Sequence, residues 1–231
     1  MNFDTILQEL ESLGTAQNRK VIRKHGVGEN FYGVSFADLH KLQKKIKQDH
    51  SLAMQLWATG NQDARMLATM IADPKQADDS LLESWVNDLD NYIITDTFSD
   101  FAKKTPLAKE KMDTWMASQE EWIGRAGWRM LTYQAMEHIS LPDEYFEGYL
   151  AIIERDIHKR KNRVKDAMNS ALIAIGVRNS HLEALSMAAA GRIGKVDVDH
   201  GETNCKTPDA RSYIEKTLRR KGYFLTSVES R

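Results

Sequence analysis

Cysteine is nearly absent from this chain, since Cys205 is the single one among 231 residues. An intramolecular disulfide is therefore excluded, and one lone thiol is typical of a reducing compartment, so we expect a cytoplasmic protein. The N-terminal residues Met1–Asp4 lack both the basic and the apolar region of an ordinary secretory signal. The longest apolar stretch, residues 171–177, is far too short to span a membrane, and we expect no membrane association.

An excess of charge of either sign is also missing. The chain has 32 Lys and Arg residues against 33 Asp and Glu residues, which leaves a formal net charge of −1. Overall charge thus gives no argument for nucleic-acid binding, and any basic face has to be offset by acidic residues elsewhere. No linker, low-complexity run or charge block divides the chain. We expect a single domain over residues 1–231, present as a monomer.

Proline and glycine are sparse, with 4 and 13 residues, and runs of β-branched and aromatic residues at the period of a strand are nearly absent. Helix-forming residues are frequent instead, which predicts an all-α chain. Each proline separates two amphipathic segments, namely at Pro74, Pro106, Pro142 and Pro208. Helix pairs that recur at about 35–45 residues are typical of an α–α superhelix, a HEAT- or armadillo-like solenoid. A compact helical bundle is the alternative.

Three segments carry a more specific signal. In the first, residues 32–35 precede an expected helix over 36–47 with Ser35 as its N-cap, followed by residues 56–57 and 63–68. The second is residues 90–98, and the third is 115–118 followed by 122–126. In order and spacing, these segments resemble the DNA alkylation repair family of AlkD-like DNA glycosylases, which are built from HEAT-like repeats. The resemblance covers about residues 15–180.

The resemblance implies an aromatic residue and an aspartate one helical turn apart, facing a DNA-binding cleft, and Tyr92 and Asp96 meet this spacing. Residues at i and i+4 share a helix face, so the ring and the carboxylate can contact one nucleotide. In a glycosylase, Asp96 would stabilise the sugar cation that develops as an alkylated purine leaves, and would orient the attacking water. The alternatives are that Asp96 caps or hydrogen-bonds a neighbouring helix and that Tyr92 belongs to the core.

Two positions depart from the family pattern. The family's glycosylases usually carry tryptophan where this chain has Tyr92, and a second tryptophan on a later helix where it has Ser170. Tryptophan is the best cation–π partner for a cationic base, so both differences imply weaker recognition of an alkylated purine. The resemblance therefore implies the fold and DNA binding more strongly than catalysis.

The resemblance also implies that Arg125 contacts DNA. It lies on an expected helix over residues 121–136 with Arg129 one turn on, and this pair can grip a phosphate bidentately. The alternative for Arg125 is a salt bridge to Glu120 or Glu121.

Residues 155–165 form a dense basic run. This run ends one expected helix and opens the next, where cations and backbone amides can both face a phosphate. From this run we expect DNA contacts from Lys161, Arg163 and Lys165. The alternative is a solvated helix face. That is the role we expect for a second basic cluster, which consists of Lys216, Arg219, Arg220 and Lys221.

Residues 197–209 form the most unusual stretch, because they concentrate Asp, His, Glu and Cys, all of which can bind metals. Their spacing matches no zinc finger, HExxH motif or EF-hand, and a loop pair such as His200 and Cys205 rarely has the geometry of a nucleophilic site. We expect a structured, self-hydrogen-bonded loop without a metal. A metal-dependent hydrolase built around His200 is an alternative that metal analysis would test.

The expected function is therefore that of a HEAT-like protein that binds double-stranded DNA, including alkylated DNA. The expected activity is that of an N-glycosylase that excises N3- or N7-alkylated purines without a cofactor. The alternative is a non-catalytic helical-repeat module that binds DNA or protein, because such solenoids are mostly interaction scaffolds. The two hypotheses differ in where Tyr92 and Asp96 point.

Overall fold

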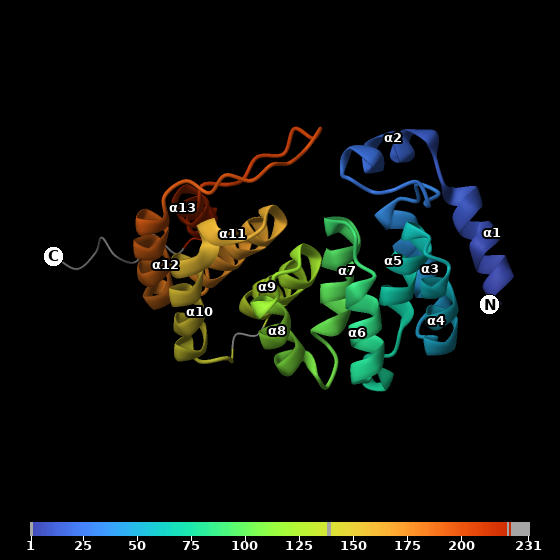
Figure 1. Cartoon of the computed structure of the whole chain (residues 1–231), viewed down its shortest axis with the longest axis horizontal. Coiled ribbons are helices and arrows are strands. Elements are labelled where there is room, and N and C mark those ends of the chain that lie inside the picture. Colours follow the sequence, from blue (N-terminus) through green and yellow to red (C-terminus); the bar gives the residue numbers. More distant parts are fainter. Residues whose placement is uncertain (1, 138–139, 221, 223–231) are drawn as a thin grey trace.

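A computed structural model describes residues 2–137, 140–220 and 222. Over these residues it contains thirteen α-helices and two short 3-10 helices, and it has no strand. The helices follow one another along an arc in two rows (Figure 1). This arrangement confirms the predicted all-α superhelix over the compact bundle. Lys221 of the second basic cluster lies outside the described residues.

The two rows consist of alternating helices along the chain. The outer row comprises α4 (His50–Ala58), α6 (Asp79–Asn87), α8 (Ala108–Ala117), α10 (Asp143–Asp156) and α12 (Ser180–Ile193). The inner row comprises α3 (Phe36–Ile46), α5 (Gln62–Ile71), α7 (Tyr92–Ala102), α9 (Glu121–Glu137), α11 (Asn162–Gly176) and α13 (Ala210–Arg220). The remaining helices are α1 (Phe3–Leu13), α2 (Ala16–Lys24), η1 (Pro74–Gln76) and η2 (Ile157–Lys159).

Local side chains set most of the helix starts. A polar N-cap side chain accepts a hydrogen bond from a first-turn N–H in α1 to α7 and in α12, including the predicted cap Ser35, which binds the Asp38 N–H. Such caps satisfy N–H groups that have no partner within the helix. The expected helix over 36–47 ends one residue earlier, because Lys47 adopts a φ of 67° and closes the last turn.

Aromatic side chains fill the space between the rows. Trp57 on α4 and Trp85 on α6 stack with centroids 4.1 Å apart and planes 5° apart. Phe98 on α7 continues the cluster at 6.3 Å from Trp57 and 5.4 Å from Trp115 on α8. The indole nitrogens are satisfied, since Trp57 donates to Asp88 and Trp115 to Glu83. These buried rings thus hold the outer helices α4, α6 and α8 against one another and against α7.

Two segments outside the rows lie on the same side of the arc. They are α2 and the extended stretch of residues 194–209, which approach one another above the inner row (Figure 1). Residues Gly201–Cys205 of this stretch share surface hollows with residues of α2. We call the side of the inner row that faces these two segments the inner face. Within the described residues, no helix is long and apolar enough to cross a membrane.

Candidate nucleic-acid interface

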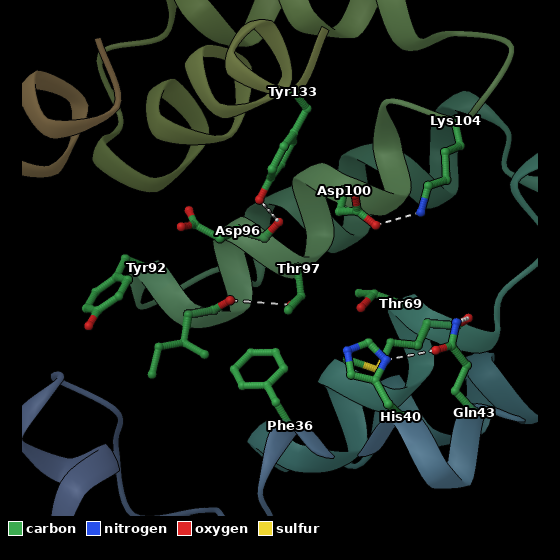
Figure 2. Close-up of a pocket in the computed structure, with 12 residues that line it drawn as sticks. Phe36, His40, Gln43, Thr69, Tyr92, Asp96, Thr97, Asp100, Lys104 and Tyr133 are labelled. Carbon is green, nitrogen blue, oxygen red and sulfur yellow. Dashed lines mark hydrogen bonds and ion pairs between the residues drawn. The ribbon is translucent and has the colours of Figure 1, made fainter. Parts of the chain in front are cut away.

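The inner face brings α7, α9 and α11 side by side, and Tyr92 and Asp96 project from the first turns of α7 (Figure 2). The Asn91 side chain caps α7 by accepting from the N–H groups of Ile93 and Ile94. Tyr92 is consequently the first residue of the helix, and Asp96 lies one turn further along the same side. Both line a cavity of about 400 Å³ bounded by α3, α5, α7 and α9.

Asp96 is tied to α9 through Arg125. The Arg125 Nε and Nη2 donate to the two carboxylate oxygens of Asp96 at 2.9 and 3.0 Å. Its Nη1 donates to Asp166 Oδ2 at 2.7 Å and to the Arg163 carbonyl at 3.1 Å, both on α11. Arg125 is only 3% exposed. Burial alone lowers its pKa, but the carboxylates of Asp96 and Asp166 more than offset this effect and raise the pKa above its ordinary value.

These contacts differ from both partners that the sequence suggested for Arg125. Its guanidinium is buried against Asp96 and Asp166, and it is not open to a phosphate in this structure. The salt bridge to Glu120 or Glu121 was the wrong alternative. Glu120 pairs with Lys161 at 3.4 Å, and Glu121 accepts from the Arg163 backbone N–H at 2.6 Å. The Glu121 bond also occupies an N–H at the start of α11, where a phosphate contact was expected.

A second arginine and a tyrosine of α9 also reach Asp96. Arg129 Nε lies 3.3 Å from Asp96 Oδ1, and its Nη2 donates to the Tyr133 hydroxyl at 3.1 Å. The Tyr133 hydroxyl donates in turn to the Asp96 carbonyl at 3.3 Å (Figure 2). The Asp96 side chain keeps 25% of its surface exposed. One carboxylate is therefore paired with two guanidinium groups at the edge of the cavity.

Tyr92 is enclosed by residues from three other parts of the chain. Its hydroxyl binds His25 Nδ1, and the guanidinium carbons of Arg163 and Arg125 lie 4.8 and 5.4 Å from its ring centroid. Burial raises the pKa of Tyr92, while burial and then the Arg163 charge lower the pKa of His25. Both shifts favour the uncharged forms, a protonated Tyr92 hydroxyl beside a neutral His25 imidazole. The ring already carries cation–π contacts of the kind that a cationic base would make.

The predicted basic residues do not form one cluster. Arg163 joins Tyr92 and lies 3.4 Å from His200 Nδ1, whereas Lys161 extends to the N-terminal end of α9. Asp197 of the extended stretch pairs with Lys195, which lowers its pKa, and the charge of Lys165 lowers that pKa further. On an α-helix, residues two apart point in different directions, so Arg163 and Lys165 line different sides of α11.

The stretch over residues 197–209 is the structured loop that the sequence predicted. His200 Nε2 lies 2.9 Å from Thr207 Oγ1, and the Thr203 hydroxyl donates to the His200 carbonyl at 2.9 Å. Asn162 on α11 holds Asp199 through two hydrogen bonds of 2.7 and 2.8 Å. Across the described part of the chain, no three His, Cys, Asp or Glu residues are grouped to hold a metal ion. Within the loop, these contacts use the side chains of His200, Thr203 and Thr207.

Three residues of the site were missed from the sequence: His25, Asp166 and His200 as a neighbour of Arg163. His25 lies 67 positions before Tyr92, and Asp166 lies 41 positions after Arg125. Asp166 did carry one local signal, since it is an aspartate near the start of a helix beside a basic run. No local pattern around His25 distinguishes it from a surface histidine.

The fold and the inner face define a HEAT-like helical-repeat protein. The family model described as DNA alkylation repair enzyme matches residues 6–213, and the chain therefore belongs to this family.

The chain is similar to two uncharacterized proteins of Listeria. It is 29% identical to Lin0241 of Listeria innocua and 30% identical to Lmo0209 of Listeria monocytogenes, each over 95% of this chain and 99% of the relative. A solved structure is described as a new family of proteins related to the HEAT-like repeat DNA glycosylases with affinity for branched DNA structures. It matches with a TM-score of 0.89 and 29% identity over 96% of this chain and 95% of that one.

The buried pairing of Arg125 with Asp96 predicts a coupled loss of stability. Replacing Arg125 by Met removes the ion-pair partner of Asp166 and leaves Asp96 with Arg129 alone, so we expect the free energy of unfolding to fall by about 3–5 kcal/mol. The same change should cost less in an Asp96→Asn background, because one of the carboxylates is then neutral. Urea unfolding of the four proteins measures this coupling. As a control, Arg192→Met removes an exposed pair with Glu154 and should cost under about 1 kcal/mol. Equal losses in both backgrounds would contradict the coupling.

The environment of His25 predicts a pH effect. In the folded protein, the His25 ring should titrate below 6.5, and Arg163→Gln should raise its pKa part of the way back, since burial acts independently. Because the folded-state pKa is lowered, the stability from neutral His25 is present above the unfolded pKa and is lost as the pH falls through the folded pKa. NMR titration of the histidine rings measures both values. His181, whose pKa is raised mainly by its hydrogen bond to Glu147, is the internal control. An unchanged His25 pKa in Arg163→Gln would exclude the Arg163 effect.

Proposed function

We propose that this protein binds double-stranded DNA along its inner face, that it prefers branched DNA to a linear duplex, and that it leaves the glycosidic bond intact. Membership of the DNA alkylation repair family supports DNA as the ligand. The likeness to a solved protein with affinity for branched DNA supports the preference, because 29% identity extends over nearly the whole of both chains.

The pairing of Asp96 with two arginines is the observation that supports the proposal that the glycosidic bond stays intact. A glycosylase uses a negative charge beside the sugar to stabilise the cation that develops as the base departs. Here Arg125 donates to both carboxylate oxygens of Asp96 and Arg129 lies at 3.3 Å, so the Asp96 charge is already paired with two guanidinium groups. We assign Asp96 to holding these arginines in place, which makes it a positioning residue of a binding surface.

Arg129 and Arg163 are the cations that this surface offers beside Tyr92 and Asp96. Each keeps part of its side chain accessible, whereas Arg125 is buried. We infer that Arg129 and Arg163 contact phosphates on this surface, with Lys161 at its edge, and that Lys165 contacts a phosphate from the neighbouring side of α11. Arg125 contributes indirectly, by fixing the helices that carry the other residues.

A second candidate function is the excision of N3- or N7-alkylated purines. One observation favours it: the Asp96 side chain is 25% exposed and, together with Tyr92, lines the cavity of about 400 Å³. In that case a bound cationic base would have to compete with Arg129 for the carboxylate.

Binding should be electrostatic and sensitive to DNA shape. We expect a three-way junction to bind more tightly than a linear duplex of equal length, measured by fluorescence anisotropy at several salt concentrations. The plot of log affinity against log salt should have a negative slope. In Arg163→Gln/Lys165→Gln this slope should become shallower by about 0.9 for each phosphate contact removed. A Lys109→Gln/Arg192→Gln protein carries the same charge change on the outer row and should keep the wild-type slope. Equal slopes for both variants would argue against this surface.

Base release from methylated duplex DNA separates the two candidate functions. We expect neither the wild type nor Asp96→Asn to exceed spontaneous depurination, while both still bind DNA. If the wild type instead releases methylated purines and Asp96→Asn is slower by on the order of 10²–10³, the glycosylase function holds. Tyr92→Trp, which introduces a stronger cation–π partner, should then raise the rate further.

A further inference from the structure

A second and larger groove lies on the inner face beyond the Arg129–Tyr133 pair. It measures about 820 Å³ and runs between α9, α11 and α13. Tyr133 lines the first cavity and Arg129 lines this groove, so the hydrogen-bonded pair separates the two hollows. Ser170 of α11 also lines the groove, and its hydroxyl donates to the Asp166 carbonyl. A groove of this volume is within the size range of ligand sites.

The charged side chains among the described residues that line this groove are all positive. Among its described residues are three arginines, Arg129, Arg178 and Arg220, and no carboxylate, although acidic residues outnumber basic ones in the whole chain. The first cavity differs, because Asp96 and Asp100 line it. A hollow with cations and no acidic residue attracts anions, and a polyanion most strongly.

The arginines differ in what they can offer a ligand. Arg178 donates to the carbonyls of Ala135 and Leu141 at 2.7 and 3.2 Å, so it adds charge while its guanidinium is held by the protein. Arg220 is exposed on the last turn of α13. Arg129 reaches the groove while one of its nitrogens binds Tyr133. Arg129 and Arg220 therefore mark two ends at which phosphates can be contacted.

The groove also carries apolar surface, which a simple phosphate would not need. Tyr213 of α13 is 50% exposed and Met136 is 66% exposed, and both line the groove. Further apolar surface comes from Ala135 of α9, Ile173 and Ala174 of α11, and Val177 and Pro208. An exposed tyrosine beside arginines is the combination that binds unpaired nucleotides, by stacking on the base and neutralising the backbone. A paired duplex offers no free base face to such a ring.

We propose that the groove between α9, α11 and α13 binds a single-stranded segment of DNA, with Tyr213 stacking on a base and Arg129 and Arg220 contacting its phosphates. The proposal rests on the proposed function and gives a reason for a preference for branched DNA. An unpaired strand leaving a branch point would enter this groove while the duplex lies along the rest of the inner face.

The test compares two labelled DNAs that share one duplex, one blunt and one with a single-stranded arm of ten nucleotides. The full-length wild type should bind the armed DNA more tightly. Tyr213→Ala should weaken this binding by about five-fold or more and leave the blunt duplex unchanged, whereas Tyr213→Phe should retain it. Arg220→Gln should lower the salt slope for the armed DNA by about 0.7. Lys216→Gln on the same helix is the matched control, since it does not line the groove.

A second variant does not depend on removing contacts. Ser170→Glu places a carboxylate in the groove, which repels phosphates, and should abolish the advantage of the armed DNA while blunt duplex binding persists. Equal affinity of the wild type for both DNAs, or an unchanged arm preference in Tyr213→Ala and Ser170→Glu, would overturn the proposal and leave the proposed function standing. If no DNA of any form binds, the proposed function itself fails.

Discussion

The buried pairing of one arginine with two aspartates is the interaction on which the inner face depends. Arg125 on α9 binds Asp96 on α7 and Asp166 on α11, so three consecutive inner helices share one charge cluster. Because Arg125 is 3% exposed, losing either partner leaves charge in a place that water does not reach. The aromatic core joins the outer helices α4, α6 and α8 to α7. The charge cluster adds side-chain bonds between α7, α9 and α11, which also pack on one another.

The same pairing constrains what the site can do. A carboxylate held by Arg125 and Arg129 positions cations well, and for the same reason it stabilises a developing sugar cation poorly. Tyr92 is under a similar constraint, since its hydroxyl binds His25 and its ring lies against Arg163. Residue types that suit catalysis on alkylated bases are thus present, but their contacts favour a preformed binding surface.

Two hollows of opposite character flank the Arg129–Tyr133 pair. The first contains Asp96 and Asp100, and the second is lined by arginines together with an exposed tyrosine. Both carboxylates of the first hollow are paired with cations, whereas the described lining of the second groove has arginines and no carboxylate, so the second groove has the more positive lining. This difference arises because the acidic residues of the first hollow lie on α7, whereas the arginines of the second lie on α9, after α11 and on α13.

The sequence by itself determined the all-α solenoid, the breaks at the prolines, the N-cap at Ser35 and the shared face of Tyr92 and Asp96. These features depend on neighbours within about one helical turn, where capping and the helical period operate. Only the tertiary structure decided the partners of Arg125, the bond between His25 and Tyr92, and the arginine-lined groove. In the side-chain bonds of Arg125 to the aspartates and of His25 to Tyr92, the two partners lie 29 to 67 positions apart in the sequence. Such pairs are set by how whole helices pack, because the packing decides which charges lose water and must find one another.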